Sequence, residues 1–443
     1  MPVEDTVVLV VGSGGREHEL VRQLAWTADI QKVYAIPGNA GTALLDIVEN
    51  VDLSVTDVPA IVAFVHEHAV TTVLIGPEAP LLAGLSDALR AEGIVVFGAS
   101  KAAAMLEASK AFAAGFMRRQ GIPQPQYWTV HSLEEALEVI KERDPTTYVL
   151  KADGLAAGKG VVLPQTTYEA EEALQLMFSG EGFDAAGKDG VVIQERLHGP
   201  EVSAFAISDG TNVILLPFAQ DHKRLLDNNE GPNTGGMGAY TPLPSYIVSE
   251  DQTARIHAIA AQSITGMANE GNPYQGVLYI GLILAEERGG APVVIEYNAR
   301  FGDPEAEVLL PALSESDVDV AHLLIQTAHG TLPAIHPSFK TSVLTVCLAA
   351  SGYPQTPRKG DLIEGLENTY ENVIIHHAGT KKVDDTTLTN GGRVLYVTGF
   401  GPTLDEAAAH AYAAIGENAI HFEGMQYRTD IGYQGRTPNT TVV

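Results

Sequence analysis

The sequence predicts a multidomain α/β protein, and three observations support this fold class. Its 443 residues exceed what one hydrophobic core usually organises, so two to four domains are expected. The first 100 residues or so alternate short apolar runs with glycine turns and helical segments, as parallel α/β units do. Later segments pair apolar runs across short turns, which is typical of antiparallel hairpins.

The N-terminal segment predicts a small parallel sheet. An apolar run is followed by a glycine loop at residues 12–15 and by a helical pattern that ends near Ala25. The same order of run, turn and helix then recurs. The runs expected as parallel strands are residues 6–11, 32–36, 72–75 and 94–97.

The middle and the end of the chain follow other patterns. Near-helical spacing of apolar residues predicts one helix between Lys101 and Gln120. Two apolar strands between Tyr148 and Leu163 flank a glycine-rich turn, and with a further strand at 191–194 they predict a small glycine-hinged subdomain. The expected hairpins are residues 201–208 with 212–218 and residues 276–285 with 292–297, and strands at 342–349 and 393–398 with a helix from 404 to about 415 predict a C-terminal α+β module. The expected domains are residues 1–105, 106–330 and 331–443.

The composition limits the classes of partner. The 27 basic and 55 acidic side chains give a formal charge of −28, which argues against a nucleic-acid-binding or acidic-membrane-binding surface. No stretch reaches the roughly 18 apolar residues that a membrane helix needs, and the N-terminus has no signal-like pattern. We therefore expect a cytoplasmic protein. Its one cysteine, Cys347, lies in an apolar run and is expected to be a buried structural thiol.

The first glycine loop leaves three interpretations open. Gly12 and Gly14 after a strand match the start of a dinucleotide fingerprint, but Glu17 stands where the third glycine belongs. A helix start of this kind still suits an anion, because backbone N–H groups and the helix dipole both favour negative charge. A phosphate site, a tight structural turn and a dinucleotide site therefore all remain possible.

A second glycine-rich run lies between Lys151 and Val161. It is not a P-loop, which has four residues between its first glycine and the Gly-Lys pair and then Ser or Thr. Here only three residues separate Gly154 from Gly158-Lys159, and Gly160 follows the lysine. The run predicts a hairpin flap whose amides and lysines cover a triphosphate. A plain surface hairpin is the alternative.

Two further segments carry polar groups in suggestive patterns. On a strand, Glu296 and Asn298 point to the same face and can offer two oxygens to one magnesium ion, with Arg300 continuing the series as an anion clamp. The alternative is a solvated strand end. The segment 221–238 has too many glycines for a helix and is expected to form a loop, either across a cleft or simply at the surface.

Taken together, these runs resemble the bacterial phosphoribosylamine–glycine ligase family of ATP-grasp enzymes, over nearly the whole chain. The resemblance is specific, because other ATP-grasp ligases share the fold but not this full set of motifs. The motifs are GSGGREH at Gly12, PGNAGT at Pro37, GPEAPL at Gly76, KADGLAAGKGVV at Lys151, QDHKR at Gln220, GPNTGGMGAY at Gly231, RFGDPE at Arg300, HAGT at His377 and TNGGRV at Thr389.

The resemblance implies a fold and a reaction. The fold would be an N-terminal α/β domain with a Rossmann-like parallel sheet, an ATP-grasp core with a mobile lid, and a C-terminal α+β domain. The reaction would join glycine to 5-phosphoribosylamine at the expense of ATP and give glycinamide ribonucleotide, ADP and phosphate. A monomer or weak homodimer acting on these small molecules is expected.

The resemblance also implies roles for individual residues. The residues implied to bind ATP are Lys110, Lys151, Gly154, Gly158, Lys159, Gly160, Glu195, Arg196, Leu197 and Glu201. Those implied to bind phosphoribosylamine are Gly14, Gly15, Asn39, Gly41, Glu78 and Asp221, while Arg300 would hold the glycine carboxylate. Glu296 and Asn298 would bind Mg²⁺ or Mn²⁺, and Arg300, Lys159 and Asp221 are the expected catalytic residues.

Three positions depart from the family pattern, and two rival functions remain. Ala306 and Glu307 stand where threonine and glutamine are common, and Tyr297 replaces a phenylalanine. These departures bear on the surroundings of the metal site. The rivals are an ATP-grasp ligase for another carboxylate and a non-catalytic nucleotide-binding sensor. Intact Glu296, Asn298 and Arg300 argue against the sensor.

Overall fold

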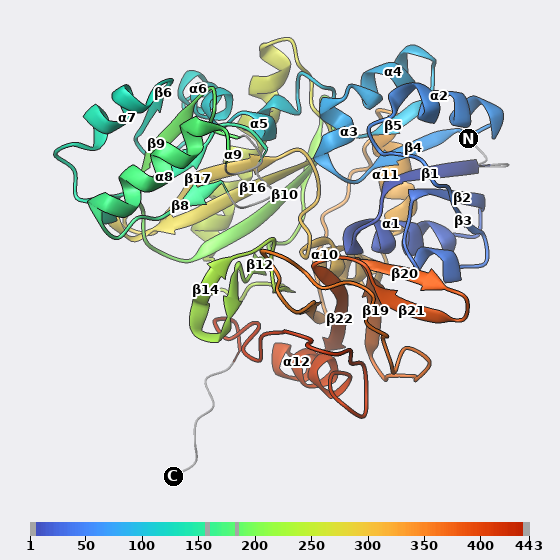
Figure 1. Cartoon of the computed structure of the whole chain (residues 1–443). Coiled ribbons are helices and arrows are strands. Elements are labelled where there is room, and N and C mark those ends of the chain that lie inside the picture. The colour runs from blue at the N-terminus through green and yellow to red at the C-terminus, as the bar shows by residue number, and fades with distance from the viewer. Residues whose placement is uncertain (1–5, 156–159, 182–185, 437–443) are drawn as a thin grey trace.

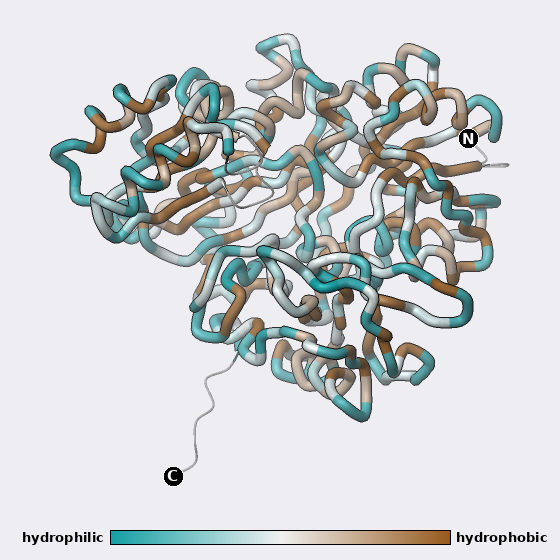
Figure 2. Tube along the Cα trace, in the orientation of Figure 1, coloured by the Kyte–Doolittle hydropathy of each residue, from teal (hydrophilic) through white to brown (hydrophobic). Residues whose placement is uncertain are grey.

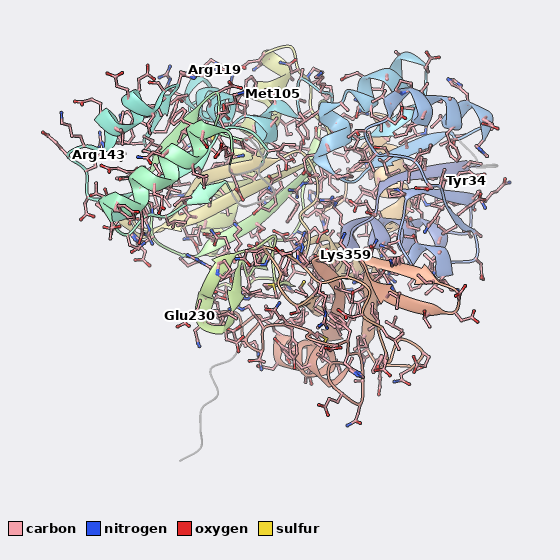
Figure 3. All side chains as sticks on the ribbon, viewed as in Figure 1. Tyr34, Met105, Arg119, Arg143, Glu230 and Lys359 are labelled. Carbon is pink, nitrogen blue, oxygen red and sulfur yellow. The ribbon has the colours of Figure 1, made fainter. Side chains whose placement is uncertain are left out.

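The computed structural model describes residues 6–155, 160–181 and 186–436. Its segments gather into an N-terminal unit, a lid, a central core and a C-terminal unit; in this view the core lies between the lid and the N-terminal unit, and the C-terminal unit lies below (Figure 1). Coloured by hydropathy, the strands that run through the interior are predominantly apolar (Figure 2). Charged side chains such as Arg143 and Glu230 lie exposed at the outer edge of the molecule (Figure 3).

The N-terminal sheet is parallel, as predicted. Its strand order is β3-β2-β1-β4-β5, so the order reverses between β1 and β4. In such sheets ligands bind at the carboxyl ends of the strands beside this reversal. The loop after β1 and the start of α3 both lie at that edge. The elements are β1 (Thr6–Gly12), α1 (Gly15–Ala25), β2 (Ile30–Pro37), β3 (Val48–Asn50), α2 (Val58–Glu67), β4 (Thr72–Ile75), α3 (Glu78–Leu82), α4 (Leu85–Ala91) and β5 (Val95–Phe97).

The single helix predicted between Lys101 and Gln120 is wrong, because the structure has two helices there. These are α5 (Met105–Ala108) and α6 (Lys110–Gln120), separated by Ser109 in an extended conformation. The Ser109 hydroxyl accepts a hydrogen bond from the backbone N–H of Phe112 at 3.0 Å, so it caps α6. Apolar spacing does not reveal such a cap, and the break turns Glu107 into the interior.

The lid is a four-stranded antiparallel sheet with two helices on it. Its strand order is β6-β9-β7-β8. The lid has its own apolar core, formed by one face of the sheet and the two helices. Its elements are β6 (Tyr127–Val130), α7 (Leu133–Ile140), β7 (Tyr148–Ala152), β8 (Val161–Val162), α8 (Thr167–Ser179) and β9 (Val191–Glu195).

The central core contains the two predicted hairpins. Strands β10 and β11 pair antiparallel, as do β16 and β17, and the sheet order is β11-β10-β16-β17. Helix α9 packs on one face of this sheet, α11 lies between the sheet and the N-terminal unit, and α10 lies between α1 and the C-terminal sheet. The elements are β10 (Glu201–Asp209), β11 (Val213–Leu215), α9 (Glu250–Asn269), β16 (Gln275–Ala285), β17 (Ala291–Asn298), α10 (Ala306–Ser314) and α11 (Val320–Ala328).

The C-terminal sheet also takes strands from the middle of the chain. Its order is β12-β15-β18-β22-β19, and helix α12 packs on β18 and β22. The elements are β12 (Gln220–Asp221), β15 (Gly238–Thr241), β18 (Ser342–Ala349), β19 (Val373–His377), β22 (Arg393–Gly401) and α12 (Leu404–Ala413), beside the hairpin β20 (Thr380–Val383) and β21 (Thr386–Thr389).

The segment 221–238 is therefore not simply a loop, and that prediction needs correction. It contains the antiparallel pair β13 (Arg224–Leu226) and β14 (Glu230–Asn233) in addition to the ends of β12 and β15. Gly231 in β14, Gly236 between β14 and β15, and Gly238 at the start of β15 have positive φ angles, which glycine adopts readily. The glycines that exclude a helix are thus compatible with a hairpin. Within the described parts of the chain, no helix combines the length and apolar character needed to cross a membrane.

Buried charges join α1 to the C-terminal sheet. The Glu19 carboxylate accepts two hydrogen bonds from Arg22, at 2.5 and 2.7 Å, and one from Gln23 at 2.6 Å. His376 on β19 lies 2.8 Å from it. Burial raises the pKa of Glu19, but Arg22 and His376 outweigh burial and hold it at about 2. The group is therefore a carboxylate at neutral pH.

We predict that Glu19→Gln lowers the free energy of unfolding by about 3 kcal/mol, because it leaves the buried Arg22 guanidinium without its counter-ion. The measurement is the urea midpoint at pH 7, read with an unchanged slope. Asp251→Asn, which removes the exposed Asp251–Arg255 pair on α9, is the matched control and should shift stability by less than about 0.5 kcal/mol. Equal effects of the two variants would contradict this account of the junction.

Candidate active site

The end of β17 presents two oxygen-bearing side chains on one face. Glu296 and Asn298 are half-buried, whereas Tyr297 between them is buried on the opposite face. The Tyr297 hydroxyl is 2.8 Å from the Ser263 hydroxyl of α9, so the extra oxygen relative to phenylalanine has a partner. The same-face arrangement predicted from the spacing is present.

The side-chain amide of Asn298 is oriented by a carboxylate from α5. The orientation that satisfies its neighbours places Nδ2 3.1 Å from Glu107 Oε1 and 3.1 Å from the carbonyl oxygen of Tyr297. Nδ2 is thereby engaged, and Oδ1 is the atom left on the other side of the amide.

Arg300 lies between two carboxylates. Its Nε donates to Glu78 at 2.9 Å, its Nη2 is 3.0 Å from Glu107, and its Nη1 donates to the carbonyl oxygen of Phe301 at 3.2 Å. Burial alone would lower the pKa of Arg300, but Glu107 and Glu78 raise it above its ordinary value. A guanidinium has five N–H donors, so after these contacts donors remain on Nη1 and Nη2 for a substrate anion.

Lysines surround Glu296. Lys151 donates to the carbonyl oxygen of Ile295 at 2.7 Å, and Lys223 lies 3.6 Å from the Glu296 carboxylate. Burial lowers the pKa of Lys151 to about 8 despite the nearby Glu296. Burial likewise raises the pKa of Glu296, but Lys223, Lys151 and Lys110 more than offset burial and lower it. The pocket is therefore positive enough to receive an anion beside a carboxylate.

Lys110 contacts the first glycine of the glycine-rich flap, Gly154. The Lys110 ammonium donates to the carbonyl oxygen of Gly154 at 2.6 Å, and Gly154 adopts a φ of +129°. Gly160 lies at the far end, where its carbonyl oxygen accepts from the N–H of Ala152 at 2.8 Å. Gly158 and Lys159 lie outside the described residues.

The chain leaves the lid through the segment predicted to line the adenine pocket. Glu195 pairs with Arg288 at 2.8 Å, the N–H of Arg196 donates to Thr147 at 2.8 Å, and Leu197 is buried in a small apolar cluster with β16 and β17. Glu201 at the start of β10 pairs with Lys223 at 2.9 Å.

The pKa of Asp221 is shifted by burial and by nearby carboxylates. Burial raises its pKa to about 7; Lys223 acts in the opposite direction, and Glu305 and Glu201 add to the rise. Strongly shifted groups in clefts are candidates for proton transfer. Asp221 is therefore a candidate for proton transfer.

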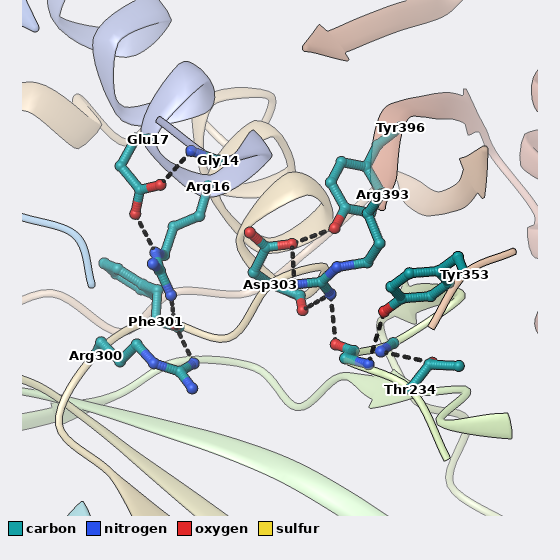
Figure 4. Close-up of polar contacts among 12 residues, drawn as sticks. Gly14, Arg16, Glu17, Thr234, Arg300, Phe301, Asp303, Tyr353, Arg393 and Tyr396 are labelled. Carbon is teal, nitrogen blue, oxygen red and sulfur yellow. Dashed lines mark hydrogen bonds and ion pairs between the residues drawn. The ribbon is translucent and has the colours of Figure 1, made fainter. Parts of the chain in front are cut away.

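At the N-terminal loop, Glu17 fills the place of the third glycine. Its carboxylate accepts from the N–H of Gly14 at 2.7 Å and from Arg16 at 2.5 Å (Figure 4). A side chain at Gly12, Gly14 or Gly76 would collide with Glu17. These glycines thus make room for a carboxylate at the helix start, where a dinucleotide fingerprint needs a glycine for close packing. The arrangement argues against a dinucleotide site.

The next loop is held by Asn39. Its amide donates to the carbonyl oxygens of Ser13 and His377, at 2.9 and 2.7 Å, and accepts from the N–H groups of Gly41 and Thr42. These four bonds fill the capacity of an amide. A direct contact of this side chain with substrate would have to replace one of them. Gly41 packs closely on the His377 ring, so a larger residue there would clash.

Arg393 of the C-terminal sheet contacts the segment that follows β17. This side chain pairs with Asp303 at 3.3 Å and donates to the carbonyl oxygen of Gly235, and Tyr396 donates to Asp303 (Figure 4). Arg393 thereby ties the segment after β17 to the glycine loop before β15.

Glu307 is an unusual buried acid beside this cluster. It is completely buried, and among the described residues neither of its side-chain oxygens has a hydrogen-bond partner. Burial and the neighbouring Asp303 raise its pKa well above the ordinary value. Gly15 at the start of α1 packs directly against it. The neutral form of Glu307 is therefore more favoured than in an ordinary glutamate, and a neutral acid has nearly the shape of glutamine.

The structure brings the predicted site residues in the described parts of the chain around one junction, where the lid, the core and the N-terminal loops meet. Sequence reasoning assigned no role to Glu107, Asp303 or Arg393. The one signal for Glu107 was a lone acidic residue within an apolar stretch. Asp303 and Arg393 stood within quoted motifs, but nothing local showed that they pair.

The donor set suits a hard divalent cation held jointly with phosphates. In residues 6–155, 160–181 and 186–436, no group of three His, Cys, Asp or Glu side chains is placed to hold a metal ion. Glu296 and Asn298 can contribute two oxygens, and Mg²⁺ commonly takes one or two carboxylate or amide oxygens together with substrate phosphates and water. The residues fit a metal–nucleotide complex rather than a closed protein cage.

Family models match almost all of the chain. Residues 6–107 match the N domain of phosphoribosylglycinamide synthetase, residues 108–306 its ATP-grasp (A) domain and residues 343–434 its C domain. The chain is 44% identical over 431 residues to the phosphoribosylamine–glycine ligase of Vibrio cholerae, covering 96% of this chain and 98% of the relative. The enzyme of Ralstonia nicotianae is 43% identical, with 96% and 99% covered.

Solved structures agree in fold. The phosphoribosylamine–glycine ligase of Thermotoga maritima is 35% identical and superposes with a TM-score of 0.83, covering 96% of this chain and all of that one. The biotin carboxylase domain of 2-oxoglutarate carboxylase from Hydrogenobacter thermophilus, in complex with magnesium ADP, has a TM-score of 0.75 at 17% identity and covers 95% of this chain and 91% of that one. The second likeness shows the ATP-grasp fold alone.

We predict that Glu307→Gln stabilises the protein increasingly as pH rises from 5 to 8. The unfolded chain releases this proton near the ordinary glutamate pKa while the folded protein keeps it, so wild-type stability falls with pH by up to about 1.4 kcal/mol per unit. Glutamine removes that dependence. Thermal midpoints of both proteins across this range measure the difference. The exposed variant Glu172→Gln should show a flat difference, and a flat difference for Glu307→Gln would mean that the carboxyl is not held protonated.

Proposed function

The chain belongs to the phosphoribosylamine–glycine ligase family, and on that premise we propose that the junction around Glu296, Asn298 and Arg300 is its active site. The protein is an ATP-dependent ligase of purine biosynthesis that joins glycine to 5-phosphoribosylamine. It works with a divalent metal and small-molecule substrates. The observation that carries the site assignment is that the oxygen pair of β17, an arginine with free donors, the buried Lys151 and the half-buried Lys110 converge beside the N-terminal loops.

The chemistry explains why these groups are needed. A carboxylate is a poor electrophile, so its oxygen must first be converted into a leaving group by phosphorylation. Two anions must approach each other for this step, and Lys110 and Lys151 reduce their repulsion. A divalent cation bound to Glu296 and Asn298 would add further positive charge at the phosphates and orient them.

Arg300 positions the carboxylate that is to be activated. Its remaining N–H donors form a planar fork that matches a carboxylate. Glu78 and Glu107 hold the guanidinium from the other side, so glycine would meet a fixed group. A pocket built around this arginine should favour the smallest amino acid.

The amine substrate is assigned to the N-terminal loops. Gly14, Gly15, Gly41 and Glu78 lie at the carboxyl edge of the parallel sheet, and Asn39 supports the loop that contains Gly41. Asp221, with its pKa near 7, would accept the proton that the amine loses as it attacks the activated carbonyl. No covalent enzyme intermediate is needed.

The lid should exclude water from the activated acid. The flap residues Gly154, Gly158, Lys159 and Gly160 would cover the phosphates, and Glu195, Arg196, Leu197 and Glu201 would hold the nucleoside. A cavity of about 380 Å³ lies between strand β8 of the lid and the hairpin β13–β14, with Arg224 and Asn233 in its lining. Closure of such a gap would protect the acyl phosphate from hydrolysis.

The remaining assignments complete the proposal. The working domains are residues 1–105, 106–330 and 331–443, with the lid over about residues 127–198. Mg²⁺ or Mn²⁺ supplies the divalent charge, and the enzyme acts in the cytoplasm.

We predict that the purified enzyme with Mg²⁺ and ATP forms ADP rapidly only when glycine and phosphoribosylamine are both present. The unstable amine can be generated in place from ammonia and ribose 5-phosphate, and the product followed by mass. Ribosylamine without its phosphate should react at least about a hundredfold more slowly, because two or three charge-assisted hydrogen bonds are lost. Alanine should replace glycine poorly.

Two variants control this assay. Glu296→Gln should abolish metal-dependent turnover and keep the fold, whereas Glu172→Gln on the outer face of α8 should leave turnover unchanged. Formation of ADP without a glycine-containing ribonucleotide, or equal use of an unrelated carboxylate, would overturn the substrate assignment. Full activity of Glu296→Gln would remove β17 from the metal site.

A further inference from the structure

One buried carboxylate contacts three consecutive residues at the end of β17. Glu107 is only 7% exposed, and its Oε2 accepts from the backbone N–H of Ala299 at 2.7 Å. Its Oε1 lies 3.0 Å from Arg300 Nη2 and, in the amide orientation that satisfies the neighbours of Asn298, 3.1 Å from Nδ2 of that residue. The carboxylate therefore touches both side chains that face the substrates and the backbone between them.

The contact with Asn298 decides which atom of the amide is free. An amide offers an acceptor oxygen on one side and N–H donors on the other, and only the oxygen can bind a cation. Glu107 and the carbonyl oxygen of Tyr297 both accept, and both lie 3.1 Å from the same amide nitrogen. The reversed amide would set its oxygen against two acceptors.

We propose that Glu107 is a positioning residue for the divalent-cation site, which turns Asn298 so that Oδ1 rather than Nδ2 is offered to the cation. The same carboxylate steadies Arg300 beside that cation. This inference rests on the proposed function, because it requires Asn298 to be a cation ligand. Glu107 itself does not bind the cation.

The substitution Glu107→Gln should reverse the Asn298 amide. The backbone N–H of Ala299 cannot move, so the oxygen of the introduced glutamine is held there and its NH₂ group faces Arg300 and Asn298. The NH₂ group of the glutamine would then face the NH₂ group of Asn298, unless the Asn298 amide rotates by half a turn about its Cβ–Cγ bond. The turned amide accepts from the glutamine, gives up its hydrogen bond to the carbonyl oxygen of Tyr297 and presents Nδ2 to the cation, which it repels.

The test is the binding of Mn²⁺ to the enzyme at saturating ADP, followed by the loss of the free Mn²⁺ signal in electron paramagnetic resonance. Glu107→Gln should weaken Mn²⁺ binding at least about tenfold, as loss of a ligand-orienting partner commonly does. ADP binding in EDTA should change little. The matched control is Glu270→Gln, since Glu270 also accepts from an arginine and an amide, Arg119 and Gln120, both at 2.8 Å.

A second substitution distinguishes an effect of Glu107 on the orientation of the Asn298 amide from a purely structural effect. The carboxylate introduced by Asn298→Asp has two equivalent oxygens, so one can accept from the glutamine of Glu107→Gln while the other meets the cation. Adding Asn298→Asp to Glu107→Gln should therefore recover at least about fivefold in Mn²⁺ affinity. In the wild-type background Asn298→Asp faces the Glu107 carboxylate and should bind Mn²⁺ no more tightly than the parent. A purely structural role of Glu107 predicts no such recovery.

The outcomes distinguish the two proposals. Unchanged Mn²⁺ affinity in Glu107→Gln, or the same effect of Asn298→Asp in both backgrounds, would overturn the role of Glu107. If Glu296→Gln also left Mn²⁺ binding unchanged, the metal site itself would be wrong. Should Glu107→Gln fail to fold, Asn298→Asp alone decides, because tighter Mn²⁺ binding by that variant would show that no opposed carboxylate governs position 298.

Discussion

The Arg300 guanidinium, held between Glu78 and Glu107, is the interaction on which the arrangement of the site depends. The guanidinium is half-buried and keeps its charge, so counter-ions close by stabilise it. One comes from the N-terminal sheet, at the start of α3, and the other from α5 at the entry to the core. Pairing at both positions fixes the N-terminal unit against the end of β17. The N-terminal loops and the end of β17 are thereby held next to each other.

The segment that follows Arg300 contacts both α1 and the C-terminal sheet. The carbonyl oxygen of Phe301 accepts from both Arg16 of α1 and Arg300, at 2.9 and 3.2 Å. Asp303, two residues further on, receives Arg393 and Tyr396 from the C-terminal sheet. Three parts of the chain thus converge on a few consecutive residues. This geometry is consistent with the proposed placement of three substrates around the end of one strand.

Local pattern predicted the strands, the hairpins and the shared face of Glu296 and Asn298, because strand periodicity depends only on neighbours in sequence. It missed features set by single side chains or distant partners. The cap at Ser109 splits a helix whose apolar spacing continues across it. Glu107 meets Ala299, 192 residues later in the chain, and no local signal reveals that contact. The resemblance named the loop of Asn39 as a substrate site, but only the structure shows that its amide is already fully bonded.

The most direct measurement of this account is a crystal structure of the enzyme with Mn²⁺ and ADP, with the cation located by its anomalous scattering. The account predicts Mn²⁺ between the Glu296 carboxylate and Oδ1 of Asn298, with Nδ2 of Asn298 on Glu107 and Arg300 still paired with its two carboxylates. A cation bound without Asn298, or an Arg300 that has left both Glu78 and Glu107, would contradict it.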